Sequence, residues 1–228
     1  EPVWWGDDPE PLPDQPAPAA SSRPTPVPSA TPTLPGRPLP VFRNTYYDFP
    51  QEPASSAGDR ATVFDASCQP IAEVAKSFHD QLCVQGSGRL KSGATVSFAK
   101  RDCACAAVCP RTDQKICFEK LDPKQFPHGR GARGTAITPL RSVAVDPDVV
   151  PLGTPLYIPA YHGLRRPDGT PHDGCFLAED RGLKVKGHHV DIFTGAPTTT
   201  TSWNRSVPSN SGVLVHLSAA RCAYLAKR

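Results

Sequence analysis

The sequence predicts a mainly β protein with a proline-rich N-terminal segment, and three observations lead to this class. From Thr135 onward, short apolar runs alternate with proline and glycine, the pattern of short strands joined by turns. An apolar spacing of three and four residues, typical of a helix, occurs between Pro70 and Cys83. The chain also contains eight cysteines, which is many for its size. Short strands with such breaks favour a β-sandwich or a small barrel.

The first forty residues predict an extended tether that precedes one domain of residues 41–228. Of the 28 prolines in the 228-residue chain, thirteen lie in this segment, among Ser, Ala and Thr. Such a composition is typical of polyproline-like linkers and provides no periodic apolar face. The chain starts at Glu1 and runs directly into the tether. We therefore interpret it as a trimmed chain whose export signal has been removed.

The first half of the domain predicts two strands, a helix and a strand pair. Residues 41–48 (VFRNTYYD) are rich in β-branched and aromatic residues, and residues 62–64 form a second apolar run. The helix is expected over 70–83, with Pro70 in its first turn. Alternating apolar residues over 90–98 then predict a strand pair that turns at Ser92 and Gly93.

The cysteines predict disulfide bonds. A zinc ribbon requires two Cys-x2-Cys knuckles, and the sequence contains none. Disulfides place the protein in an oxidising compartment, so we expect a periplasmic, cell-envelope or secreted protein. Their connectivity stays open, and we expect a disulfide-rich insertion at about residues 100–120. The cysteines are Cys68, Cys83, Cys103, Cys105, Cys109, Cys117, Cys175 and Cys222.

The second half of the domain predicts repeated short strands. Residues 197–212 are expected to form a surface loop and residues 218–227 a short closing helix. The expected strands cover residues 142–146, 154–158, 175–179, 189–193 and 213–217.

Composition and motifs exclude several classes of function. A net charge of +3, without a basic stripe or recognition motif, argues against nucleic acid as a partner. No apolar run approaches the roughly 20 residues needed to span a bilayer. The histidines lack a metal-binding frame, so we interpret them as polar loop residues and expect neither a metal nor a cofactor. The histidines meant are His162, His172, His188 and His189.

We also expect the protein to be a monomer.

Three aspartates lie at the end of, or inside, short apolar strands: Asp146, Asp180 and Asp191. On the last of these strands, alternation assigns Val190 and Ile192 to the core and Asp191 to a cleft. Glu179 alternates away from Asp180, and we expect it to be solvated.

The residues around these aspartates resemble the three-aspartate, or 3D, domain of bacterial cell-wall enzymes. The matching blocks occur in the family's order. They are 144–147 (AVDP), 150–154 with 156–158 (VPLGT, LYI), 178–182 (AEDRG), 185–187 (VKG) and 190–193 with Gly195 (VDIF). Where the family usually has Asp-x-Gly-Gly, this chain has Leu183 in place of the second glycine, which narrows the approach of a sugar or forbids a positive φ there.

The resemblance implies a six-stranded double-psi β-barrel that binds peptidoglycan glycan strands. It implies lytic transglycosylase activity on the bond between N-acetylmuramic acid and N-acetylglucosamine, which leaves a 1,6-anhydro end. The family match makes Asp191 the acid/base, and Asp180 and Asp146 orient it or stabilise positive charge. One carboxyl with a raised pKa is able to donate and then accept the proton. Lys186 is a candidate to bind sugar or hold a carboxylate, and Thr138 is a second candidate.

Two alternatives remain at this point. An inverting β-1,4-glycan hydrolase would use Asp180 and Asp191 with a water between them, because such enzymes need two carboxyls about 6.5–9.5 Å apart. A non-catalytic, expansin-like wall-binding module would hold glycan on aromatic side chains such as Tyr157, Tyr161 and Trp203.

Overall fold

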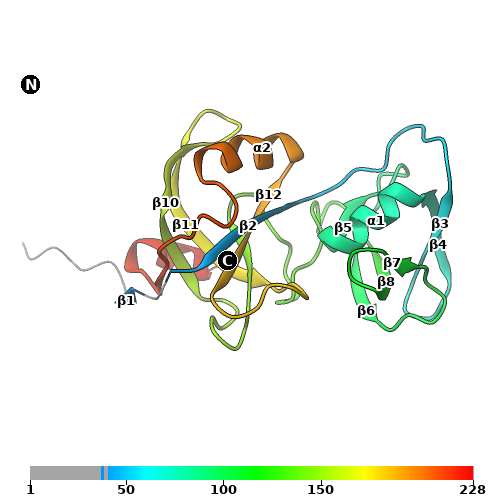
Figure 1. Ribbon diagram of the computed structural model, residues 1–228, viewed down its shortest axis with the longest axis horizontal. Helices are drawn as coiled ribbons and strands as arrows, with labels where there is room; N and C mark the ends of the chain where they lie inside the picture. Colours follow the sequence, from blue (N-terminus) through cyan, green and yellow to red (C-terminus); the bar gives the residue numbers. More distant parts are fainter. Residues whose placement is uncertain (1–36, 39–40, 228) are drawn as a thin grey trace, which may run out of the picture. The chain divides into compact units, whose positions relative to one another are not determined.

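Three β-sheets and few helices make up the part of the chain that the structure, a computed structural model, describes: residues 37–38 and 41–227 (Figure 1). The mainly β prediction is confirmed. The tether predicted for residues 1–40 lies outside the described residues, except for residues 37–38, which form the short strand β1. Among the described residues, no helix has the length and apolar character needed to span a membrane.

The largest sheet has seven strands in the order β1-β13-β10-β11-β9-β12-β2. Two of its neighbouring pairs, β11 with β9 and β12 with β2, are parallel, and the others are antiparallel. The strands are β1 (Arg37–Pro38), β2 (Arg43–Asp48), β9 (Ser142–Val145), β10 (Pro155–Arg165), β11 (Pro171–Asp180), β12 (His189–Gly195) and β13 (His216–Leu217).

The segment between β2 and β9 forms the two smaller sheets. One pairs β3 with β4, and the other has the order β5-β6-β8-β7. The elements are β3 (Arg60–Phe64), β4 (Pro70–Ala75), α1 (Lys76–Gln85), β5 (Ser87–Arg89), β6 (Thr95–Arg101), β7 (Val108–Cys109) and β8 (Gln114–Leu121). The predicted turn at Ser92 and Gly93 lies between β5 and β6, where the Gly93 N–H donates to the Leu90 carbonyl.

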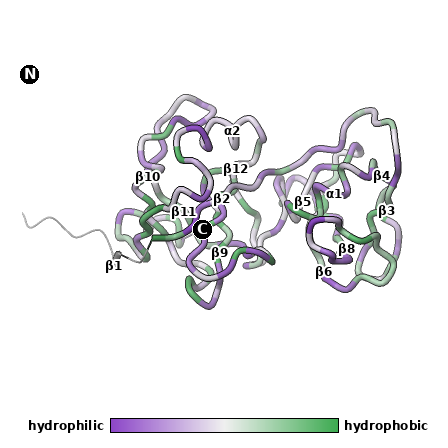
Figure 2. The backbone as a smooth tube through the Cα atoms, viewed as in Figure 1, coloured by the Kyte–Doolittle hydropathy of each residue, from purple (hydrophilic) through white to green (hydrophobic). Residues whose placement is uncertain are grey.

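Alternation along β12 separates its two faces, as the sequence predicts. Val190 and Ile192 lie in the main hydrophobic core with Val143 and Val145 of β9. Phe193 packs on the other face, in a smaller cluster with Tyr47 and Ala144. The segment 60–121 has a core of its own around Phe78, Leu82 and Phe118. In Figure 2 hydrophobic stretches accordingly appear in β3 and β8 as well as in β9.

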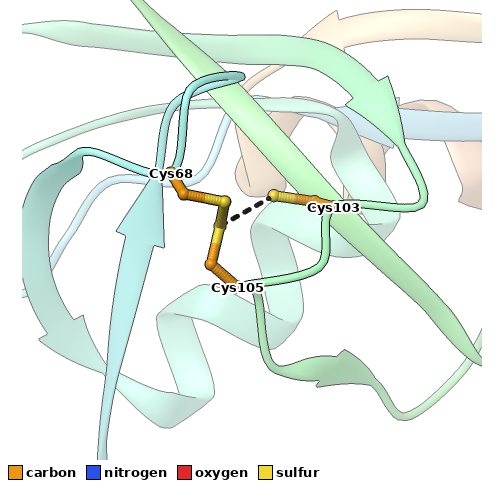
Figure 3. A group of neighbouring side chains, drawn as sticks. All are labelled: Cys68, Cys103 and Cys105. Carbon is orange, nitrogen blue, oxygen red and sulfur yellow. Dashed lines mark hydrogen bonds between the residues drawn. A yellow bond between two sulfur atoms is a disulfide. The ribbon is translucent and has the colours of Figure 1, made fainter.

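All eight cysteines form disulfides, which confirms the sequence prediction. Three of the four bonds join residues between Cys68 and Cys117. In one place, shown in Figure 3, Cys103 Sγ lies 3.4 Å from Cys105 Sγ of a neighbouring disulfide. The cysteines are therefore cross-links in this structure. The pairs are Cys68–Cys105, Cys83–Cys109, Cys103–Cys117 and Cys175–Cys222.

The helix predicted over 70–83 is wrong in its first half. Pro70–Ala75 forms β4, in which Val74 pairs with Ala61 of β3, and α1 begins at Lys76. The spacing of apolar residues fits a helix, but pairing buries Val74 beside Val63 in the smaller core. Tertiary packing of a β-branched residue overrides the local period here.

The surface loop predicted for 197–212 is wrong for residues 197–206, while 207–212 contain only bends and turns. Pro197–Ser206 forms helix α2, which begins with proline and buries Trp203. The indole N–H of Trp203 donates to the Arg165 carbonyl at 3.0 Å, and its ring stacks on Tyr161. A run of threonines is a poor helix signal, so this packing stabilises α2. The closing helix prediction corresponds to the 3-10 helix η1 (Ala220–Lys227).

Three side chains expected in solvent are buried. Glu179 is 7% exposed and accepts a hydrogen bond of 2.6 Å from the Ser142 hydroxyl. His172 and His189 lie inside strands β11 and β12 and are also buried. His189 is on the same face of β12 as Asp191 and contacts Thr45, and a register shift interrupts the alternation of β11 between Ala178 and Asp180. Alternation within one strand therefore does not reveal which side chains the neighbouring segments cover.

The predicted six-stranded, double-psi barrel is not confirmed. In the described part of the chain the strand pairs form an open series, with β1 and β2 at its ends. The coarser prediction of a mainly β domain with a short helix and a disulfide-rich segment holds.

Candidate active site

Strand register brings Asp180 and Asp191 to the same row of the large sheet. Ala144 of the central strand β9 is the partner of Asp180 on β11 and also of Asp191 on β12. On the next strand Thr45 is the partner of Asp191. Side chains directly opposite in neighbouring strands point to the same face. Because neighbouring strands lie about 4.8 Å apart, the two aspartates are roughly 10 Å apart at Cα, with a small alanine between them.

This row borders a cavity of about 500 Å³. The large sheet contributes Tyr47, Ala144, Asp180 and Asp191. The remaining lining comes from α1 and the four-stranded sheet with the turns beside it, from the segment 130–134 and from the segment 181–185. These residues are Cys83, Val84, Gln85, Gly86, Ser87, Phe98, Arg101, Arg111, Thr112, Gln114, Ile116, Arg130, Gly131, Ala132, Gly134, Arg181, Gly182, Leu183, Lys184 and Val185.

Asp191 is placed to retain a proton. Burial raises the pKa of its carboxyl to about 6, and the negative charge of Asp180 adds to the increase. Two neighbours act in the opposite direction: Thr45, whose hydroxyl donates to Asp191 Oδ1 at 2.6 Å, and Arg43. A carboxyl in this range is partly protonated near neutral pH and is suited to general acid catalysis.

Asp180 accepts more hydrogen bonds than Asp191 does. Its Oδ1 accepts the backbone N–H of Arg181 at 2.9 Å and of Ala132 at 3.1 Å, and its Oδ2 accepts the Tyr47 hydroxyl at 3.1 Å. Burial raises the pKa of Asp180 above its ordinary value, although these three hydrogen bonds reduce the increase. Burial raises the pKa of Tyr47 as well, so its phenol stays protonated and donates.

The two carboxyls therefore occupy unlike environments in one cavity. Asp180 accepts three hydrogen bonds, which favour its ionised form, whereas Asp191 accepts one and is mainly desolvated. Two carboxyls that differ in hydrogen bonding and desolvation support acid/base chemistry in which one carboxyl carries the proton and the other stabilises positive charge.

Asp146 does not line this cavity. Its Oδ2 accepts the Gly187 N–H at 2.8 Å, and its Oδ1 accepts the Asp148 N–H at 3.3 Å and lies 3.7 Å from Lys186 Nζ. The Gly187 bond is the main cause of its lowered pKa. Asp146 thus anchors the turn that leads into β12, and Lys186 faces this carboxylate.

Thr138 lies in the turn before β9, outside the cavity lining. Its N–H donates to the Ser142 hydroxyl at 2.8 Å, and its carbonyl accepts the N–H groups of Arg141 and Ser142. Leu183, where the family usually has glycine, lines the cavity and is 40% exposed. It does not have a positive φ, so its effect concerns the shape of the cavity.

Sequence reasoning missed three residues next to the carboxyls. Thr45 and Tyr47 share one face of β2, and each donates to one aspartate. His189 lies 2.8 Å from the Thr45 hydroxyl through its Nε2 atom. The alternation of the predicted strand 41–48 places Thr45 and Tyr47 together, but the parallel pairing of β2 with β12 is needed to place them at the aspartates.

Comparison with known proteins identifies the class of domain. Residues 141–206 match the family described as the 3D domain. This match includes all three aspartates, so the chain carries a 3D domain as the sequence motifs predict. No curated protein sequence matches the chain.

Two solved structures share the fold over most of the chain. E. coli MltA with bound chitohexaose has a TM-score of 0.56 and 17% identity, covering 79% of this chain and 72% of that one. The membrane-bound lytic murein transglycosylase from Agrobacterium tumefaciens has a TM-score of 0.58 and 16% identity, covering 81% and 76%. Residues 141–206 therefore match the 3D domain, and the chain shares its fold with these two structures.

Proposed function

We propose that this protein is a peptidoglycan lytic transglycosylase that cleaves the β-1,4 bond between N-acetylmuramic acid and N-acetylglucosamine. The observation that carries the proposal is the pair Asp180 and Asp191, two carboxyls in unlike environments within one cavity. The names of the two structures with the same fold support it, because both are lytic transglycosylases and one holds a chitooligosaccharide.

In this reaction Asp191 is the acid and then the base. Its proton goes to the glycosidic oxygen as the bond to the anomeric carbon breaks, and the N-acetylglucosamine chain leaves as an alcohol. The muramyl 6-hydroxyl then attacks the anomeric carbon and gives its proton to Asp191, which closes the 1,6-anhydro ring. Asp180, as a carboxylate, stabilises the positive charge that develops at the anomeric carbon.

The other predicted residues receive more limited roles. We assign Asp146 to positioning, because its bond to Gly187 holds the turn before β12. Of the two tasks predicted for Lys186, its distance to Asp146 favours holding a carboxylate. A contact between Thr138 and the sugar remains a prediction.

The remaining proposals concern the whole chain. Four disulfides support an extracytoplasmic location in the cell envelope or outside the cell. A double-psi arrangement is supported by the two parallel strand pairs flanking the antiparallel pair β9 and β12. We also propose a tether of residues 1–40, one domain of 41–228 and a monomeric state.

The test is digestion of purified sacculi with mass analysis of the products. We expect 1,6-anhydromuropeptides, and we expect Asp191→Asn to lower the rate by about 10²–10⁴-fold, the usual contribution of a general acid. The matched control is Asp168→Asn, because Asp168 is exposed and bonds only within its own turn to Thr170.

The inverting hydrolase is the second candidate, favoured by the spacing of Asp180 and Asp191 two strands apart, which leaves room for a water. It predicts reducing ends that take up ¹⁸O from labelled water. Anhydro ends without ¹⁸O would exclude it. Binding of glycan with no turnover in the unsubstituted protein would instead identify a wall-binding module.

A further inference from the structure

The disulfide-rich segment 103–117 contributes a wall of the cavity that contains Asp180 and Asp191. Arg111, Thr112 and Gln114 of this segment line the cavity, together with Arg101 at the end of β6. None of these residues belongs to the matched 3D domain of residues 141–206. The wall is therefore a feature of this chain that the acid/base pair does not explain.

Three disulfides and one hydrogen bond hold this wall in place. Cys83–Cys109 ties it to α1, Cys68–Cys105 ties it to the turn between β3 and β4, and Cys103–Cys117 closes its base. On the other side, the Lys184 ammonium donates to the Arg111 carbonyl at 3.0 Å, which joins the wall to the segment after β11. A wall fixed at these four points keeps its backbone positioned before a ligand arrives, which lowers the entropic cost of binding.

The wall and the segment facing it carry an excess of positive charge. Arg130 is paired with Glu119, and Lys184 is bound to the Arg111 carbonyl. In the described part of the chain, the exposed guanidinium groups of Arg101, Arg111 and Arg181 have no ion pair. Guanidinium groups form forked hydrogen bonds with carboxylates, so this set is suited to an acidic ligand.

Two buried polar atoms beside Arg111 lack hydrogen bonds. Thr112 Oγ1 and Gln114 Oε1 are both buried, and neither has a partner among the described residues. Both residues line the cavity. Buried polar atoms are nearly always hydrogen-bonded in proteins, so these two can bind hydroxyl or amide groups of a ligand when their side chains turn toward the cavity.

We propose that Arg101, Arg111 and Arg181 bind carboxylates carried by the glycan, while Thr112 and Gln114 bind its neutral polar groups. The lactyl carboxylate of N-acetylmuramic acid has the required chemistry in peptide-free glycan, where no stem peptide is attached to it through an amide bond. The protein would thus select acidic glycan over a neutral chain with the same backbone. This inference rests on the proposed function for the identity of the glycan.

The experiment compares two tetrasaccharides by titration calorimetry. One is chitotetraose, which is neutral, and the other is the peptide-free tetrasaccharide of alternating N-acetylglucosamine and N-acetylmuramic acid. The protein carries Asp191→Asn to prevent turnover, and mass analysis checks the ligands afterwards. We expect the acidic ligand to bind about tenfold more tightly at low salt, as two or three exposed ion pairs provide. Added salt should weaken this preference.

The test variant adds R101Q, R111Q and R181Q. We expect it to lose the preference while its affinity for chitotetraose changes less than about twofold, whereas R205Q, an exposed arginine on α2, retains the preference. Thr112→Val should weaken both ligands. An equal loss for both ligands in the triple variant, no preference before substitution, or no binding of either ligand overturns the inference.

Failure of the proposed function gives a different result. Sacculi that yield no anhydro products, together with an intact preference for the acidic ligand, overturn the transglycosylase assignment but not carboxylate binding by the three arginines. Anhydro products together with no preference for the acidic ligand support the transglycosylase assignment and overturn carboxylate binding by the arginines.

Discussion

Asp191 has a raised pKa mainly because burial removes water from its carboxyl, and only secondarily because Asp180 is nearby. The Thr45 hydroxyl opposes this effect by donating to Oδ1 at 2.6 Å. The pKa of about 6 is thus a balance between desolvation and one hydrogen bond. Substituting Thr45 changes one side of this balance without changing the acid itself.

At the residue scale, we expect Thr45→Val to raise the pKa of Asp191. Because Asp191 acts as an acid when protonated, the alkaline limb of the pH profile of kcat should move upward by about one pH unit, the equivalent of one hydrogen bond to a charged group. Thr45→Ser keeps the hydroxyl and should leave the profile unchanged. Equal shifts in both variants would show that packing, rather than the hydrogen bond, sets the pKa.

At the scale of elements, strand β9 separates the two aspartates and β12 is fixed at its start. Ala144 pairs with both Asp180 and Asp191, so its small side chain leaves the space between them open. The turn before β12 is held by Asp146 through the Gly187 N–H, and Gly187 has a φ of +64°. Asp146 thereby helps to fix where β12, the strand that carries Asp191, begins.

We expect Asp146→Ala to lower the melting temperature and to reduce activity by less than about tenfold, since the reacting groups stay intact. Asp146→Asn keeps one acceptor oxygen and should be milder. The alkaline limb of kcat should stay where it is in both variants. A shift of this limb, or a loss as large as that of Asp191→Asn, would place Asp146 in the chemistry.

The stabilising effect of Asp146 also depends on pH. Its folded-state pKa is lowered, so its contribution is present above the ordinary pKa of an aspartate, 3.8, and is lost as pH falls through the lowered value. The difference in melting temperature between the unsubstituted protein and Asp146→Asn should therefore be largest near neutral pH and should shrink below pH of about 4.

At the scale of the whole molecule, two cores are stabilised in different ways. The main core, around Val143, Val190 and Trp203, contains no cysteine. The smaller core around Phe78 and Phe118 belongs to the segment with three of the four disulfides. The cavity is lined by residues of both regions, so its shape depends on cross-links as well as on apolar packing.

We expect a reducing agent to loosen the four-stranded sheet before the seven-stranded sheet, because each disulfide typically contributes about 2–4 kcal/mol. Hydrogen exchange should accelerate first in β5, β6 and β8, while β9 and β12 stay protected. Replacing Cys175 and Cys222 by serine should instead affect mainly η1 and its contacts. Simultaneous loss of protection in both sheets would show that the two cores unfold together.

The sequence by itself determined the β class, the disulfides, the 3D motifs and the face of β12 that carries Asp191. These features are local: alternation, turn residues and short motifs lie within a few residues of one another. Tertiary structure decided the rest. It turned 70–75 into a strand and 197–206 into a helix, because Val74 and Trp203 gain cores formed by distant segments.

The same division applies to the site. Three similar aspartates are visible in the sequence, but strand register brings Asp180 and Asp191 into one row and leaves Asp146 at a turn. Thr45, Tyr47, Arg101 and Arg111 come from segments far from the motifs, whereas Arg181 lies within the block 178–182. Their roles depend on the parallel pairing of β2 with β12 and on disulfides, which join residues that no local pattern relates.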